Sequence, residues 1–86
     1  MTLHVRIAHR NDILAWLNLG AEVEPLFGPL RYNPGFLHAI EKHIDDSTAF
    51  CVRVDNGPSG APLMGGLLFS CDPPLYEISW LAVSAA

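Results

Sequence analysis

The final twelve residues, LYEISWLAVSAA, constrain the fold most, because they predict a strand that is apolar on both faces towards its end. Such a pattern is typical of a strand that is covered above and below. We therefore expect other elements, or a partner, on both sides of this strand. Simple alternation predicts one face with Tyr76, Ile78, Trp80 and Ala82, and a second face with Glu77, Ser79, Leu81 and Val83.

The first 24 residues predict a strand followed by a helix. Residues 3–8 alternate apolar and polar side chains, which indicates a strand with one buried face carrying Leu3, Val5 and Ile7. The short side chain of Asn11 or Asp12 can cap the first turn of the helix that follows. We expect this helix to end near residue 24, before Pro25.

The middle of the chain predicts a loop, a second helix and a hairpin. Residues 25–33 contain two prolines and a glycine, which indicates a shaped loop. A helix is then expected to begin with Asn33 as its N-cap and Pro34 as its first helical residue. We expect this helix to end at residues 45–47. Gly65 and Gly66 interrupt one strand and indicate a bulge, a close backbone approach or simple flexibility. Three strands are predicted at residues 48–55, 63–70 and 75–86. The turns at residues 56–62 and 71–74 connect them.

Composition excludes several classes of function. The chain has 86 residues, a net charge of -4 and five scattered basic residues, so it offers no cationic stripe for nucleic acid. No apolar stretch is long enough to span a membrane, and we expect a cytoplasmic protein. Cys51 and Cys71 are expected to be free thiols, about 13 Å apart in the hairpin, and His38 and His43 lack the spacing of a metal pair.

The chain resembles the N-terminal half of the GNAT superfamily of acyl-CoA-dependent N-acetyltransferases. The resemblance covers essentially all of it: strand, helix, helix and a three-stranded antiparallel meander ending in EISWLAVSAA. It implies an α+β fold and acetyl-CoA as co-substrate. It also implies that the backbone of Leu81, Ala82 and Val83 binds the pantetheine arm as an added strand.

A family loop that holds the pyrophosphate, Arg/Gln-x-x-Gly-x-Gly/Ala, would follow this strand, and the sequence stops at Ala86 before it. We therefore expect residues 1–86 to be a single partial domain. Losing about three charge-assisted hydrogen bonds removes on the order of 5 kcal/mol of binding free energy. The chain alone is thus expected to bind acetyl-CoA weakly and to be catalytically incomplete.

The resemblance also suggests catalytic residues. Glu77 lies four residues before Leu81 and, by simple alternation, on the same strand face, where some family members place a glutamate base. Such a base would remove the proton from an acceptor amine. A backbone N–H near Leu81 would polarise the thioester carbonyl. The alternative for Glu77 is an ordinary solvated carboxylate at a strand edge.

Acceptor recognition in this family is commonly built from the connection between the first two helices. The candidates here are Glu22, Glu24, Phe27, Arg31 and Tyr32, because carboxylates suit a cationic amine and aromatic rings give shape. The alternative is an ordinary loop with a solvated acidic end. The sequence does not identify the acceptor amine.

A second class of function remains open. The chain is only 16% charged, against roughly 25% in typical soluble domains, so an apolar surface patch is expected. A non-enzymatic association module would use the edge of the final strand to pair with a partner. This alternative predicts a homodimer or a swapped oligomer formed through that strand.

Overall fold

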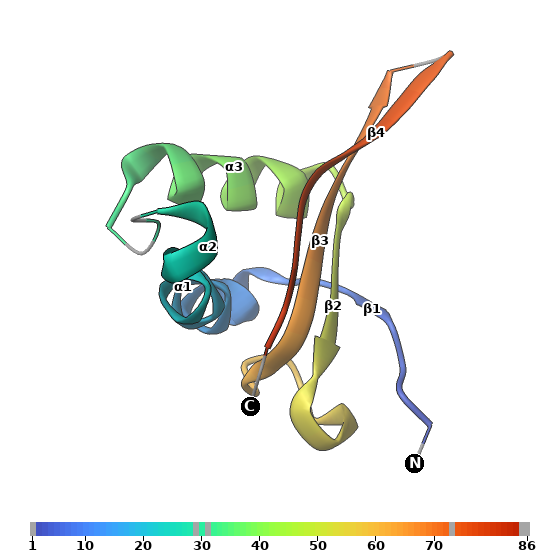
Figure 1. The fold of residues 1–86 in the computed structure, drawn as a ribbon. Coiled ribbons are helices and arrows are strands. Elements are labelled where there is room, and N and C mark those ends of the chain that lie inside the picture. Colours follow the sequence, from blue (N-terminus) through green and yellow to red (C-terminus); the bar gives the residue numbers. More distant parts are fainter. Residues whose placement is uncertain (1, 29, 31, 73, 85–86) are drawn as a thin grey trace.

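All the helices lie on one side of a four-stranded antiparallel sheet in the computed structural model of the chain (Figure 1). The structure describes residues 2–28, 30, 32–72 and 74–84, with the backbone alone at residues 26, 27, 71 and 72. The α+β order predicted from the sequence is confirmed, and the strands are ordered β1-β2-β3-β4. In chain order the elements are β1 (Arg6–Ile7), the 3-10 turn η1 (Arg10–Asp12), α1 (Ile13–Glu22), α2 (Glu24–Phe27), α3 (Pro34–Asp45), β2 (Ala49–Arg53), the 3-10 turn η2 (Val54–Asn56), β3 (Leu63–Asp72) and β4 (Leu75–Val83).

Helix α3 begins and ends where the sequence predicts. The Oδ1 atom of Asn33 accepts a hydrogen bond of 2.8 Å from the N–H of Gly35, and Pro34 takes the first helical position. This cap satisfies one of the backbone donors that a helix leaves unpaired at its start. The buried side of the helix carries Phe36, Ile40 and Ile44.

The first helical region differs from the prediction in two ways. Pro25 does not follow the end of a helix but lies in the first turn of the short helix α2, where a missing N–H costs no hydrogen bond. Part of the segment predicted as a loop is therefore helical. Asp12 occupies the position before α1 but its side chain does not cap α1, because its carboxylate accepts hydrogen bonds from the N–H of His9, at the start of η1, and from Arg53.

The β2–β3 hairpin has the predicted pairing to within one residue. Cys51 pairs with Gly66, next to the expected position 67, and β3 pairs with β4 along most of its length. The ladder has two irregularities. Met64 is an extra residue of β3 opposite β2, and Ser79 is an extra residue of β4 opposite β3.

The core lies between the helices and one face of the sheet, and Trp16 is its centre. Its side chain is fully buried, and a Cβ atom on Gly66 would lie only 2.4 Å from its Cη2 atom. Gly66 therefore makes room for an indole ring and not for another backbone, while the bulge of this strand lies at Met64. Trp80 completes an aromatic cluster, with ring centroids 5.7 Å from Trp16 and 5.2 Å from Phe36.

The predicted burial of the first strand is wrong. Leu3, Val5 and Ile7 are 52%, 68% and 45% exposed, and only residues 6 and 7 pair as β1. Ile7 pairs with Phe50 and faces away from the helices, on the side of the sheet that none of the described elements covers. Apolar and polar side chains do alternate along this segment. The apolar ones lie on the face of the sheet that points away from the helices, which we call the open face.

The extra residue Ser79 also changes the faces of β4. Glu77 pairs with Ser70 and Trp80 pairs with Leu68, two residues apart on β3, so Glu77 and Trp80 point to the same side. By the same reasoning Tyr76 and Ile78 share the open face with Leu81 and Val83. The two faces predicted by simple alternation are therefore wrong on the N-terminal side of the bulge.

Candidate functional site

The outer edge of β4 is the first candidate site. No strand in the described part of the chain pairs with this edge. The N–H of Ser84 bonds the carbonyl of Met64 on β3 at 2.7 Å. Backbone groups of an antiparallel strand alternate between its two edges, so the N–H and C=O groups of Leu81 and Val83 point outward. This edge can accept an extended ligand or another strand.

An apolar hollow lies on the open face beside this edge. Its volume is about 210 Å³, and apolar side chains and the backbone of the central strands form its wall. Gly65 contributes to the floor because it has no side chain on this face. The side chains around the hollow include Val5, Phe50, Val52, Leu67, Leu81 and Val83.

Glu77 lies apart from both features. It is exposed in the arm that the β3–β4 ribbon forms beyond the helices (Figure 1). The prediction that it shares a face with Leu81 is wrong, because the extra residue Ser79 turns it to the opposite side. The separation along the strand is about 13 Å. A carboxylate so placed does not face a ligand on the outer edge at Leu81 and Val83.

The predicted acceptor residues are distributed over three places. Glu22 ends α1, and its Oε1 accepts a hydrogen bond from the hydroxyl of Ser84, so it lies beside the end of β4. Glu24 accepts a bond of 3.2 Å from the N–H of Leu30 and holds the loop together. Tyr32 is 89% exposed. The side chain of Phe27 and all of Arg31 lie outside the described residues.

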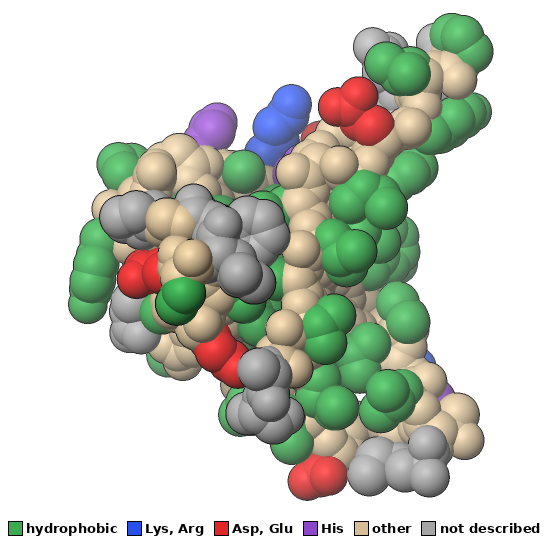
Figure 2. Space-filling view, in the orientation of Figure 1, with side chains coloured by type: hydrophobic (Ala, Val, Ile, Leu, Met, Phe, Trp, Pro, Cys, Tyr) green, Lys and Arg blue, Asp and Glu red, His purple; other side chains and the backbone are tan. Residues whose placement is uncertain are grey.

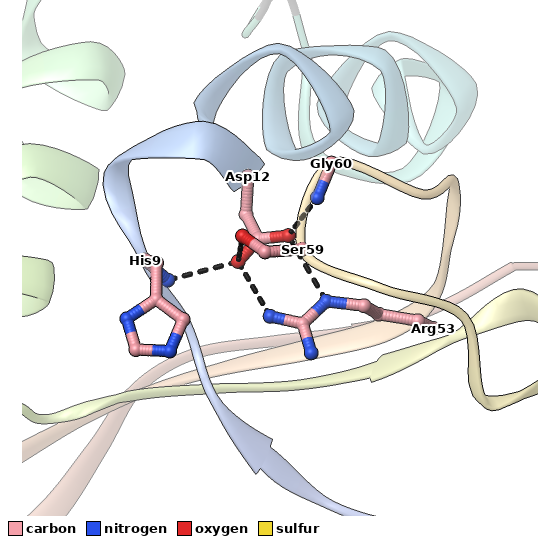
Figure 3. Close-up of polar contacts among 5 residues, drawn as sticks. All are labelled: His9, Asp12, Arg53, Ser59 and Gly60. Atoms are coloured by element: carbon pink, nitrogen blue, oxygen red, sulfur yellow. Dashed lines mark hydrogen bonds and ion pairs between the residues drawn. The ribbon is translucent and has the colours of Figure 1, made fainter.

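A buried ion pair between Asp12 and Arg53 is the polar centre of the molecule (Figure 3). Arg53 donates from Nε and Nη2 to the two carboxylate oxygens at 3.0 and 2.7 Å. The N–H groups of His9 and Gly60 donate at 2.8 Å, and the hydroxyl of Ser59 at 3.2 Å. These five donors join the start of α1, the end of β2 and the hairpin loop, so the arrangement is structural.

The hydrogen bonds determine the charge state of Asp12. Burial alone raises the pKa of a carboxyl group, but the hydrogen bonds from Arg53, Gly60 and His9 outweigh it and lower the pKa from 3.8 to about 2. Sequence reasoning missed this pair. A signal was present, because Arg53 occupies an inward position in the alternation that buries Ala49 and Cys51.

The remaining candidates give no second site. Cys51 is a free, buried thiol as predicted, and burial raises its pKa, which makes the thiolate less available. The side chain of Cys71 lies outside the described residues. Among the residues that the structure describes, no three His, Cys, Asp or Glu side chains form a metal-binding group. None of the described helices has the length and hydropathy needed to cross a bilayer.

Comparison with known proteins gives no assignment. The sequence matches no protein-family model and no curated protein. Function therefore has to be argued from the geometry of the β4 edge, the hollow and the open face.

Proposed function

We propose that the chain binds the pantetheine arm of acetyl-CoA in an N-acetyltransferase reaction that acetylates an amine. The observation that carries the proposal is the outward direction of the N–H and C=O groups of Leu81 and Val83, on an edge that none of the described strands pairs with. The resemblance to the GNAT superfamily supplies the reaction class. The expected cytoplasmic location belongs to the same proposal.

In this proposal the amide groups of the pantetheine arm pair with the edge as a further strand would. The N–H of Leu81 then donates to the thioester carbonyl, where negative charge develops during attack by the amine. Glu22 is the predicted acceptor residue that lies beside this end of β4, through its bond to Ser84. We assign the amine-facing role to Glu22, because it lies beside the C-terminal end of β4 through its bond to Ser84, whereas Glu77 lies about 13 Å from Leu81 along the strand.

An NMR titration with S-acetylpantetheine, which lacks the nucleotide and its phosphates, tests the proposal. We expect saturable shifts of the Leu81 and Val83 amides at millimolar ligand. A Val83→Pro variant should lose the ligand-induced shift of the Leu81 amide, because proline removes the outward donor at position 83 without removing a bond to β3. Val83→Ala is the matched control, since it retains the N–H. No saturable change at either amide would refute the proposal.

A second candidate is a non-enzymatic module that associates through the same edge. The observation that favours it is the composition of β4, which is nine residues long and carries a single charged residue, Glu77. Long edge strands with so little charge readily pair with other strands. Light scattering should then show a dimer that Leu81→Pro disrupts. A well-behaved monomer at high concentration would exclude this candidate.

A further inference from the structure

The face of the sheet away from the helices is apolar, and none of the described elements covers it. Its side chains belong to all four strands, or to the segment just before β1, and none of them is charged. Figure 2 shows hydrophobic side chains gathered along the sheet on the side away from the helices. The side chains of the open face are Val5, Ile7, Phe50, Val52, Leu67, Phe69, Tyr76, Ile78, Leu81 and Val83.

The open face is large for a molecule of this size. Six of its side chains are between 45% and 70% exposed: Val5, Ile7, Tyr76, Ile78, Leu81 and Val83. At about 100 Å² each, these six present roughly 600 Å² of apolar surface, which reaches the upper end of the range for a monomer. The whole chain exposes 5440 Å², against about 5000 Å² expected for its mass.

We propose that this surface is covered by the open face of a second copy of the chain. With the half-buried side chains added, each copy contributes an area close to the roughly 800 Å² per partner of a standard interface. Two sheets stack face to face about 10 Å apart, with their apolar side chains interdigitated. A two-fold axis brings the same surface of both copies together, and an uncharged surface meets itself without repulsion.

The two ends of the open face complement each other. At one end lies the hollow floored by Gly65. At the other end the arm carries the rings of Phe69 and Tyr76, stacked with centroids 6.3 Å apart and planes 12° from parallel. A two-fold axis that lies between the two sheets and runs perpendicular to the strands places the arm of each copy over the hollow of the other. The fit of a projecting end to a hollow end favours a second copy as the occupant.

This dimer differs from both functions proposed above. Face-to-face packing uses side chains and leaves the outward backbone groups of Leu81 and Val83 unpaired. It is therefore independent of pantetheine binding and distinct from pairing through the β4 edge. Failure of the NMR titration would not affect it, and failure of the dimer would not affect the titration.

Sedimentation velocity on the full chain, from low micromolar to near-millimolar concentration, tests the proposal. We expect a reversible dimer. Ile78→Lys should raise its dissociation constant roughly tenfold or more, because a lysine would be buried in the interface. Leu14→Lys is the matched control, since Leu14 is 63% exposed on α1, away from the open face.

Three results would overturn the proposal. A monomer at every concentration would leave the open face to another occupant, such as an amphipathic helix. A dimer that Val83→Pro abolishes and Ile78→Lys preserves would be an edge-paired dimer. Equal loss from Leu14→Lys and Ile78→Lys would show that the interface does not lie on the open face. Circular dichroism of each variant confirms that it remains folded, as substitutions at exposed positions should allow.

Discussion

The two faces of the sheet both carry apolar side chains from every strand, but their surroundings are opposite. On the helix side, Trp16 and Leu68 are buried almost completely, and even a charged side chain, Arg53, is enclosed with its partner. On the open face, Leu81 and Val83 are 52% and 70% exposed. The hydrophobic pattern of a strand therefore identifies apolar faces. The packing of the other elements decides which of these faces is buried within the chain.

The largest difference between the faces should appear at the buried ion pair. Arg53→Met leaves the Asp12 carboxylate buried without its partner, which we expect to lower the free energy of unfolding by about 3 to 5 kcal/mol. For a chain of this length the total is only about 4 to 13 kcal/mol. Urea denaturation followed by circular dichroism measures the change.

The matched control for this prediction is Arg6→Met. Arg6 points to the same side of the sheet as Cys51 but is exposed, and its Nη2 lies 3.2 Å from Nδ1 of His4. Its substitution should change stability by less than about 0.5 kcal/mol. Equal effects at Arg53 and Arg6 would contradict a special role for the buried pair.

Two leucine truncations compare the faces directly. Leu68 is 2% exposed on the helix side, and Leu68→Ala should cost about 2 to 5 kcal/mol through lost burial and a cavity. Leu81→Ala on the open face should cost about 1 kcal/mol or less in the monomer, because half of the side chain is already in water. Chemical denaturation at low protein concentration isolates the monomer.

The outcome also bears on the open face as an interface. If Leu81→Ala costs as much as Leu68→Ala at high protein concentration but not at low concentration, the open face is buried by association. Equal costs at every concentration would mean that the two faces do not differ in the way the exposed fractions indicate.

The pH dependence of stability tests the charge state of Asp12. Its pKa in the folded chain, about 2, lies below the ordinary value of 3.8, so the stabilisation is fully present above about pH 4. It is lost as the pH falls towards 2, and amounts to about 2 kcal/mol. Urea denaturation between pH 5 and pH 2 should show this slope, and Asp12→Asn should remove that part of it.

Gly66→Ala tests the packing of the core on the helix side. The added Cβ would lie 2.4 Å from the Trp16 ring, so the ring must shift, at a cost of about 1 to 3 kcal/mol. Trp16→Phe shortens the ring system, and we expect the double variant to lose less than the sum of the two single variants. Strictly additive losses in thermal unfolding would show that the two residues do not compete for space.

The order of elements was predictable because its signals are local. Asn33 and Pro34 start α3, turn residues separate β2 from β3, and the pairing of Cys51 was correct to within one residue. The site was less predictable. One extra residue, Ser79, moved Glu77 to the opposite side from Leu81, and strand alternation alone gives no warning of a bulge.

The sequence by itself determined the fold class, the α3 cap and the apolar pattern of every strand, since periodicity and breaker residues act over a few positions. Only the tertiary structure decided that Asp12 meets Arg53, 41 residues away, and that the helices cover one face of the sheet and leave Val5 and Ile7 on the other. Such choices depend on contacts between distant segments. Alternation along a strand identifies its two faces but not the element that covers each of them.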